Sequence, residues 1–249
     1  MIPKNIHYVW LGGNPLTELG QKCFDSWKKF CPDYEIIRWD ESNFNLEQNL
    51  YCKQAYEAKK YAFASDYIRL YALVNFGGIY MDTDVEVLKP LDNFLQHKAF
   101  SGFEDKTHIP TGIMGCEKAF SLFKELLEDY ENRVFIKKTG EYNMTTNVTY
   151  ITNKCLEKGL QLNNTLQEVD GFVLYPKDYF CPKNHNTKQI ILTKHSVCIH
   201  HFDGSWHFAK DYIKKYGKYW KLFFTIAHPF AALELFFEKL RERRREYYG

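Results

Sequence analysis

The sequence lacks the patterns that would assign it at once to several common classes of protein. Its seven cysteines are odd in number and include no C-x-x-C pair, which argues against a zinc ribbon, a thioredoxin-type motif and a full disulfide framework. No stretch of about 18 residues is apolar and free of charge, so no membrane-spanning helix is expected. No secretory signal peptide opens the chain. We therefore expect a cytoplasmic protein whose cysteines are buried, reduced thiols.

A strong charge of one sign is also missing. The chain has 33 Lys and Arg against 31 Asp and Glu, a net charge of +2, which is too balanced for the chain as a whole to clamp nucleic acid. A hydrophobic share of 45% is that of an ordinary globular chain, and 249 residues are enough for one large α/β domain or for two small ones. The aromatic share of 17% is high. Aromatic side chains fill cores, and they also suit flat ligands such as nucleobases and sugar rings.

Strand-like and helix-like segments alternate in the first ninety residues, which predicts an α/β fold. A strand over residues 6–11 ends at a Gly-Gly turn, apolar residues follow at helical spacing from Leu19 to Phe30, and a second strand covers residues 35–39. The turn lacks G-x-G-x-x-G, so a dinucleotide cofactor is not supported. Further elements are expected as a helix over residues 54–75 stopped by Gly77-Gly78, a strand over 79–88, short strands over 100–103 and 111–115, a helix over 121–130, a polar segment over 143–149 and a late strand over 197–201.

Two acidic residues, Asp82 and Asp84, stand in the second half of the strand predicted over residues 79–88. Residues i and i+2 of a strand point the same way, so both carboxylates are expected on one side. Neighbouring carboxylates repel each other unless a cation lies between them, and a hard divalent ion meets that need. The alternative is a surface strand end with solvated acids. A phosphotransferase of the haloacid-dehalogenase type is disfavoured, because Glu86 stands where that pattern has Thr or Val.

The chain changes character after residue 206. Lysines alternate there with Tyr, Trp and Phe, and a run of arginines follows near the C-terminus. Basic residues between aromatic ones on helices suit an anionic membrane surface. An ordinary pair of helices packed on the domain is the alternative. We therefore predict a domain over residues 1–206 and a helical extension over residues 207–249.

Four blocks of residues carry a resemblance to a known family. They read Ile2-Pro3-Lys4-x-Ile6-His7-x-x-Trp10, Ala64-Ser65-Asp66-x-x-Arg69, Gly77-Gly78-x-Tyr80-x-Asp82-x-Asp84 and His200-x-x-x-x-Ser205-Trp206. These blocks closely resemble the Asp-x-Asp sugar transferases of glycosyltransferase family 32, which include bacterial capsule and exopolysaccharide enzymes and fungal mannosyltransferases. The glucosyltransferase domain of the large clostridial toxins is similar in the same motifs, although its Ser and Trp are spaced one residue wider.

The resemblance implies a GT-A fold, in which helices flank a Rossmann-like, mostly parallel central sheet. It also implies a nucleotide-sugar donor, a divalent ion (Mn²⁺ or Mg²⁺) and retention of anomeric configuration. In this reading Asp84 coordinates the ion directly, and Asp82 reaches it through water or binds the ribose. His200 or His201 supplies a nitrogen ligand. Only one of the two can face the site, because neighbours on a strand point to opposite sides, and the family position favours His200.

Further residues are implied to bind the donor. Asp66 accepts hydrogen bonds from sugar hydroxyls, and Arg69 contacts the sugar or the phosphates; an ordinary i,i+3 ion pair on a helix is the alternative. Trp10 stacks on the nucleobase, with a place in the core as its alternative. The remaining donor-binding residues implied by the resemblance are His7, Tyr80, Asn147, Ser205 and Trp206.

The expected activity is transfer of a hexose from a nucleotide sugar, with UDP favoured, to a saccharide or a lipid-linked saccharide in capsule or exopolysaccharide synthesis. The expected location is the cytoplasm, with peripheral binding to the inner face of the cell membrane through the C-terminal extension. Three alternatives stay open: a nucleotide-sugar or glycan-binding module without catalysis, a toxin-like protein glycosyltransferase, and a membrane-recruited scaffold. No nucleic-acid partner is expected.

Overall fold

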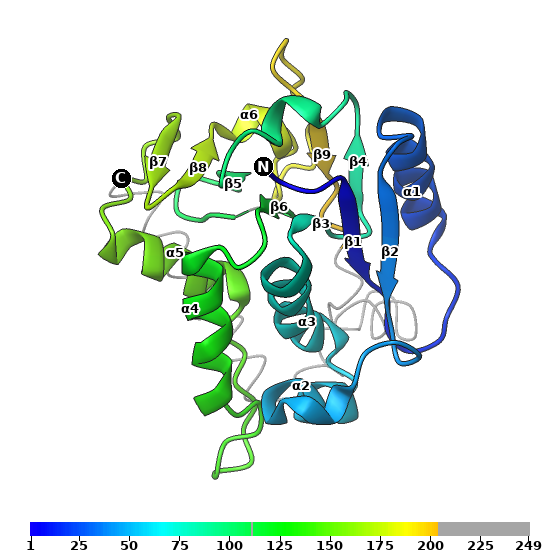
Figure 1. The fold of residues 1–249 in the computed structure, drawn as a ribbon, viewed down its shortest axis with the longest axis vertical. Helices are drawn as coiled ribbons and strands as arrows, with labels where there is room; N and C mark the ends of the chain where they lie inside the picture. The colour runs from blue at the N-terminus through cyan, green and yellow to red at the C-terminus, as the bar shows by residue number, and fades with distance from the viewer. Residues whose placement is uncertain (111, 204–249) are drawn as a thin grey trace. The chain divides into compact units, whose positions relative to one another are not determined.

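A seven-stranded sheet runs through the part of the chain that the structure, a computed structural model, describes: residues 1–110 and 112–203 (Figure 1). The strands lie in the order β2 (Glu35–Trp39), β1 (Asn5–Val9), β3 (Gly78–Met81), β6 (Ile113–Cys116), β5 (Ala99–Gly102), β8 (Phe172–Tyr175) and β7 (Gln167–Val169). β2, β1 and β3 pair in parallel, and so do β5 and β8, whereas β6 is antiparallel to both its neighbours and β7 to β8. Among these strands, only β6 and β7 therefore run against the others. The mostly parallel α/β sheet predicted from the sequence is confirmed.

Helices cover both faces of this sheet. Their bounds are α1 Glu18–Phe30, α2 Leu50–Glu57, α3 Tyr61–Phe76, α4 Ser121–Asp129, α5 Asn147–Glu157 and α6 Lys177–Phe180, with 3-10 turns η1 Leu46–Gln48, η2 Asp92–Phe94 and η3 Tyr130–Asn132. Tyr80 of β3 packs in the apolar cluster that also contains residues of α2 to α5. Its neighbours Ile79 and Met81 belong to a second cluster with Trp27 of α1. This alternation is the period of two expected of a strand buried on both faces.

Two adjacent glycines connect α3 to β3. Gly77 ends the helix at φ +68°, and its N–H donates to the carbonyl of Leu73. A Cβ on Gly77 would lie 2.7 Å from the backbone nitrogen of Lys118, and one on Gly78 would lie 2.7 Å from the carbonyl oxygen of Asn5. Positive φ and close backbone approach both require glycine here. The tight connection turns the chain back, so that the end of β3 lies beside the middle of α3.

Two predicted elements are wrong in their extent. The helix expected over residues 54–75 is divided into α2 and α3, because the backbone turns at Lys59, where φ is +57°. The strand expected over residues 79–88 is also divided. β3 ends at Met81, and the chain turns at residues 82–84 before β4 (Val85–Val87), which pairs with β9 (Cys198–His200) in a separate two-stranded antiparallel sheet. Asp82 and Asp84 therefore lie in a turn rather than on one side of a strand.

Other predictions are tested more simply. All seven cysteines are buried and free, as expected. Across the described ranges, the structure has no helix with both the length and the apolar character needed to cross a bilayer. Residues 1–203 form one compact unit. The predicted helical extension over residues 207–249 lies outside the described residues, so its role and its boundary stay predictions.

Candidate active site

A chain of charged side chains extends from the end of β3 into the interior. One guanidinium nitrogen of Arg69, Nη2, lies 3.1 Å from Oδ1 of Asp82 and 3.3 Å from Oδ1 of Asp66. The Arg69 and Asp66 side chains are only 9% and 10% exposed. Arg69 also lies over the ring of Tyr80, with 4.6 Å from Cζ to the ring centroid. Burial of an unpaired charge is costly, so this Arg between two carboxylates is a paired arrangement in which each charge supports the others.

The pKa values of these groups follow from their burial. Burial raises the pKa of Asp66 to about 6, although the nearby Arg69 and the backbone N–H of Asn147 oppose the shift. Burial also raises the pKa of Asp82, again against the attraction of Arg69 and of His200. Burial disfavours the charged form of Arg69, but the facing Asp82, Tyr80 and Asp66 outweigh it and raise its pKa, so the guanidinium stays charged. Strongly shifted groups that cluster in this way are typical of functional sites.

Two further residues named from the sequence support this chain. The hydroxyl of Tyr80 donates to Oδ1 of Asp82 at 3.0 Å. Asn147 is the first residue of α5, and its backbone N–H donates to Oδ2 of Asp66 at 3.0 Å while its side-chain amide donates to the Asp66 carbonyl at 3.2 Å. The amide oxygen Oδ1 of Asn147 and Nε of Arg69 are buried and have no hydrogen-bond partner within the described ranges. Both atoms are therefore candidates to bind a ligand in this region.

The carboxylates of Asp82 and Asp84 meet the imidazole of His200. One ligand atom from each residue lies within 4.8 Å of the others, and Nε2 of His200 is 3.5 Å from Oδ1 of Asp84. The register of the small sheet explains the meeting: His200 of β9 is paired with Val85, the residue directly after Asp84. The other carboxylate oxygen of Asp84 accepts the backbone N–H of Asp203 at 2.7 Å, which fixes its orientation.

The space beside this cluster depends on a glycine. A Cβ on Gly112 would lie 3.0 Å from Oδ2 of Asp82, 3.2 Å from Cδ2 of His200 and 2.9 Å from Cγ2 of Val85. Any other residue would therefore press on two of the three candidate ligands. Two carboxylates and one imidazole are a donor set that suits Mn²⁺ better than Mg²⁺, because Mg²⁺ prefers oxygen ligands. The residues present fit the divalent ion that the resemblance implies.

Sequence reasoning missed Glu104, which lies on the other side of the imidazole. Its Oε2 is 3.5 Å from Nδ1 of His200, so Nε2 faces Asp84 while Nδ1 faces a carboxylate. Burial lowers the pKa of His200, but Asp84, Cys181 and Glu104 together raise it well above the usual value. Glu104 belongs to none of the four motif blocks, and only its position in space identifies it. Gly112 was missed for the same reason.

The remaining residues named from the sequence lie apart from the acidic cluster. The imidazole of His201 lies 2.8 Å from Oε2 of Glu86, so it faces away from the cluster that His200 joins. His7 is fully buried, and its Nε2 and Nδ1 bond to the carbonyl of Gly77 and to the indole N–H of Trp39. This corrects the expectation for His7. Its two ring nitrogens bond to neighbouring segments of the chain, so they are not available to a nucleotide sugar.

Trp10 follows β1 at the same edge of the sheet as Asp82, because β1 and β3 are parallel neighbours. Its indole is half-buried, and Nε1 donates to the carbonyl of Asn14 at 2.6 Å. Stacking of Trp10 on a nucleobase stays a prediction. Ser205 and Trp206 lie outside the described residues, so their place beside the diphosphate stays a prediction.

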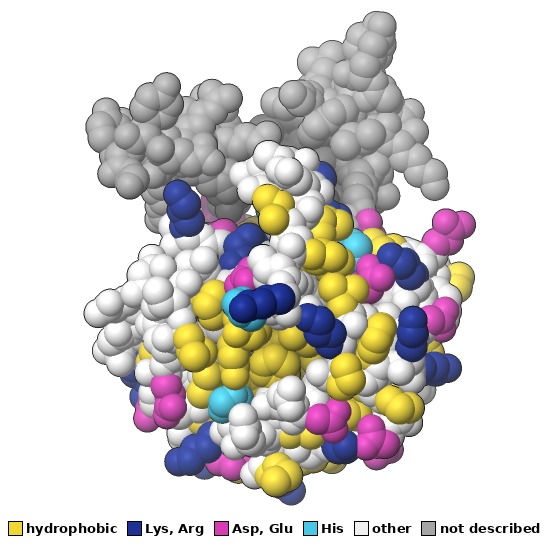
Figure 2. Space-filling view, turned by 90° about the horizontal axis from the view of Figure 1, so that it is seen from above, with side chains coloured by type: hydrophobic (Ala, Val, Ile, Leu, Met, Phe, Trp, Pro, Cys, Tyr) yellow, Lys and Arg dark blue, Asp and Glu magenta, His cyan; other side chains and the backbone are white. Residues whose placement is uncertain are grey.

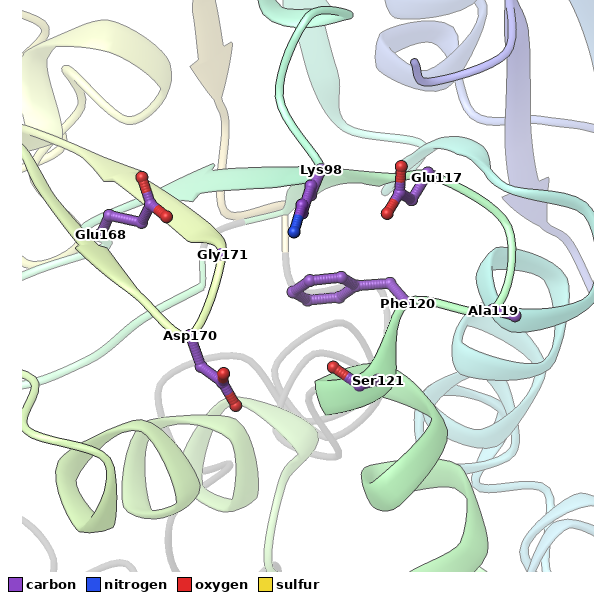
Figure 3. Close-up of a pocket in the computed structure, with 8 residues that line it drawn as sticks. All are labelled: Lys98, Glu117, Ala119, Phe120, Ser121, Glu168, Asp170 and Gly171. Carbon is purple, nitrogen blue, oxygen red and sulfur yellow. The ribbon is translucent and has the colours of Figure 1, made fainter.

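A cavity of about 530 Å³ lies elsewhere (Figure 3). It is lined by Lys98, Glu117, Ala119, Phe120, Ser121, Glu168, Asp170 and Gly171. Lys98 precedes β5 and Gly171 precedes β8, so this cavity is at the amino-terminal edge of the parallel strands. Ligands of open α/β sheets bind at the carboxyl-terminal edge, where Asp82 lies. The cavity shares no residue with the acidic cluster.

Part of the acidic cluster lies in a stretch of the chain that matches a known family. Residues 17–101, which include Asp66, Arg69, Asp82 and Asp84, match the family described as "Glycosyltransferase sugar-binding region containing DXD motif". This match includes the second and third of the four motif blocks that resemble family 32.

Two curated yeast proteins are similar over longer stretches. The chain is 28% identical to inositol phosphoceramide mannosyltransferase 3 of Schizosaccharomyces pombe over 142 residues, which cover 54% of this chain and 38% of that protein. It is 24% identical to mannosyl phosphorylinositol ceramide synthase CSH1 of Saccharomyces cerevisiae over 230 residues, which cover 83% of this chain and 53% of that protein. The chain therefore spans about half or less of the length of these relatives.

Two solved structures are also similar. One is the PaToxG glycosyltransferase, with a TM-score of 0.48, 21% identity, and coverage of 64% of this chain and 70% of that one. The other is a glycosyltransferase involved in glycosylation of the major capsid of PBCV-1, with a TM-score of 0.43, 14% identity, and coverage of 81% and 94%.

Proposed function

We propose that this chain is a metal-dependent, retaining hexosyltransferase that moves a sugar from a nucleotide sugar to a lipid-linked acceptor. One observation carries the proposal: Asp82, Asp84 and His200 converge within 4.8 Å at the end of β3, and Arg69 joins this cluster to the buried Asp66. This arrangement provides cation ligands next to a fixed positive charge. A nucleotide sugar needs both, because its diphosphate becomes more negative as the glycosidic bond breaks.

In this proposal Asp82, Asp84 and His200 would hold a divalent ion, with Mn²⁺ favoured by the mixed oxygen and nitrogen donors. Such an ion, when bound, neutralises negative charge on the departing nucleoside diphosphate. Arg69 is a second cation beside the same position, and its pKa is raised, so it keeps its charge at every physiological pH. Its buried Nε is free of partners within the described ranges and can donate to a phosphate oxygen.

Asp66 and Asn147 would bind the sugar itself. The Asp66 carboxylate already accepts from Asn147 and pairs with Arg69, so its orientation is fixed before a donor binds. A fixed carboxylate can accept a hydrogen bond from a sugar hydroxyl, and the unpartnered amide oxygen of Asn147 can accept another. Trp10, at the same sheet edge, would stack on the base. The acceptor hydroxyl would then attack from the face that the diphosphate leaves, which preserves the anomeric configuration.

The names of the curated relatives support a lipid acceptor. Both relatives are named for a mannosyl transfer that involves phosphoinositol ceramide, an anionic lipid, which favours a lipid-linked acceptor over the capsule role expected from the sequence. They also favour mannose as the sugar, so a guanine nucleotide has to be tested beside the UDP sugars expected at first. A protein that works on lipids in this way would act at a membrane surface.

The test is donor turnover by the purified chain. UDP-glucose, UDP-galactose and GDP-mannose are incubated with and without Mn²⁺, and the released diphosphate is measured together with transfer to phosphatidylinositol or phosphoinositol ceramide vesicles. We expect Mn²⁺-dependent turnover of one donor and an α-linked product from an α-linked donor by NMR. Donor binding without any turnover would instead support a non-catalytic binding module, and product of inverted configuration would remove the retaining mechanism.

A further inference from the structure

The loop between α6 and β9, residues 182–196, combines apolar and basic side chains. Three consecutive apolar residues, Ile190, Ile191 and Leu192, are 41%, 61% and 55% exposed. The same loop contains Lys183, Lys188 and Lys194 and no acidic residue. In Figure 1 the loop, in gold, reaches the top of the molecule, and Figure 2, seen from above, shows hydrophobic side chains beside Lys and His side chains on that face. Three adjacent exposed apolar side chains are unusual on a soluble surface and mark a place of contact.

The backbone of the loop is ordered by its own hydrogen bonds. The N–H of Asn184 donates to the carbonyl of Gln189 at 2.8 Å, and the N–H of Lys188 donates to the carbonyl of Asn184 at 2.9 Å. Ile191 is tied to the carbonyl of Pro182 at 3.1 Å, and Ile190 forms a β-bridge with Lys183. The exposed apolar side chains therefore belong to a turn with its own backbone hydrogen bonds, and their exposure is a property of the fold.

The end of the loop is held by α6. Oγ1 of Thr193 donates to the Asp178 carboxylate at 2.7 Å, and Oγ of Ser196 donates to the Asp178 carbonyl at 2.8 Å. His195 also lies 3.3 Å from that carboxylate and stacks on Tyr179 of α6. The Asp178 carboxylate is thus engaged by the loop itself.

The loop is also connected to the candidate active site. The ring of His185 contacts the ring of Phe202, with 5.1 Å between centroids, and Phe202 in turn packs on His200, with 4.2 Å between centroids. A surface that the loop binds would therefore be only two ring contacts away from the imidazole that joins Asp82 and Asp84. Such a position suits the delivery of an acceptor embedded in that surface.

We propose that loop 182–196 docks this domain on a bilayer that contains anionic lipid. Ile190, Ile191 and Leu192 enter the boundary between headgroups and acyl chains, and Lys188 and Lys194 meet the negative headgroups. Charge complementarity favours a membrane, because lysines lie on both sides of the apolar triplet in the sequence. The acceptor class under "Proposed function", on which this inference rests, is an anionic lipid. A protein partner or the chain's own C-terminal segment is the competing occupant.

The test is flotation of the full chain with vesicles of phosphatidylcholine alone or with 30% phosphatidylinositol. We expect the variant with Ile190→Ser, Ile191→Ser and Leu192→Ser to bind anionic vesicles about tenfold more weakly, and the variant with Lys188→Gln and Lys194→Gln to lose the preference for anionic vesicles. The matched control replaces two apolar residues of other elements, with exposures of 53% and 41%, as Leu50→Ser and Leu156→Ser, and should float like the wild type.

Hydrolysis of the nucleotide sugar in the absence of vesicles is measured on the same variants and separates the two proposals. Weakened flotation with unchanged donor hydrolysis supports the loop as a docking element. A wild-type chain that does not float overturns the proposal. A triple variant that floats like the wild type also overturns it, and assigns the membrane contact to another part of the chain. Lack of donor turnover in every variant, with flotation still dependent on the loop, removes the proposed activity and leaves the docking surface standing.

Discussion

The two edges of the central sheet differ in what they bury. At the carboxyl-terminal edge, Asp66, Arg69 and Asp82 form a chain of paired, largely buried charges. At the amino-terminal edge, the cavity of about 530 Å³ is bordered by exposed charges, among them Glu117 and Asp170, whose side chains are 38% and 49% exposed. Solvated charges cost little to place at a surface, whereas buried charges persist only where neighbours support them. From this difference we infer that a network of buried polar groups, rather than the volume of a surface cavity, is the better guide to the candidate functional edge.

The largest expected effect is on donor turnover, which should depend on the carboxyl-terminal edge of the sheet and not on the amino-terminal edge. Asp84→Asn removes one charge from the cation ligands but keeps an oxygen that can accept the N–H of Asp203, so the fold should remain. We expect donor turnover to fall by about 10³-fold, because loss of a metal ligand removes several kcal/mol of charge stabilisation. Asp170→Asn, at the cavity, should have no effect on turnover. Rates by released diphosphate and folding by circular dichroism check this, and full turnover of Asp84→Asn would end the metal role.

The second effect is on stability. Arg69→Met leaves the Asp66 and Asp82 carboxylates buried without their shared cation, which should lower the free energy of unfolding by about 3–5 kcal/mol. The exposed Lys98 at the cavity provides the control, since Lys98→Met should change stability by about 0.5 kcal/mol or less. Urea denaturation of both variants measures the difference. Equal free energies of unfolding for Arg69→Met and Lys98→Met would show that the Arg69 network does not stabilise the fold.

A smaller effect is expected from the carboxylate behind His200. Glu104→Gln weakens the partner of Nδ1, so the imidazole is less well oriented and less basic as a ligand. Loss of such a partner lowers metal affinity by about 10- to 100-fold in other proteins. Titration of Mn²⁺ by calorimetry, with Glu168→Gln at the cavity as the control, measures this without reference to turnover. An unchanged Mn²⁺ affinity would reduce Glu104 to a packing residue.

The smallest effect is a pH dependence. The pKa of Asp66 is raised by burial from 3.8 to about 6, so the folded protein binds a proton there more tightly than the unfolded chain does. The contribution of Asp66 to stability therefore increases as the pH falls from 7 towards 4, whereas its ionised form, and with it the pairing to Arg69, is lost. We expect turnover at saturating Mn²⁺ to fall about tenfold between pH 7 and pH 5. An acid limb that survives in Asp66→Asn would place the titration on another group.

Much of the fold followed from local sequence. The spacing of apolar residues predicted α1 and the strands on either side of it, because burial of one face fixes the period of a segment. The breaks at Lys59 and at residues 82–84 were not predicted. Lys59 ends α2 with a positive φ, a conformation that Gly or Asn usually adopts at a helix end, so the sequence carried no signal there. Val85 leaves the large sheet because its strand pairs with β9, more than a hundred residues later in the chain.

The site was predictable to a similar degree. Asp66, Arg69, Asp82, Asp84 and His200 could be named because they recur in motif blocks, and the structure brings all five together. His7 shares a block with Trp10 but is buried against Trp39. A motif does not distinguish a residue that binds a ligand from one that supports the fold. Glu104 and Gly112 carry no motif, and only their distances to His200 and Asp82 reveal them.

The antiparallel pairing of β4 with β9 has a consequence for how the protein is made. Asp84 and Asp203, which it brings into contact, are 119 positions apart in the chain. During synthesis, Asp82 and Asp84 therefore leave the ribosome long before His200 and the rest of β9 are added. Products of early termination within that interval retain Asp82 and Asp84 but lack His200, so they cannot assemble the cluster, and the proposed metal site exists only in chains whose synthesis has passed β9.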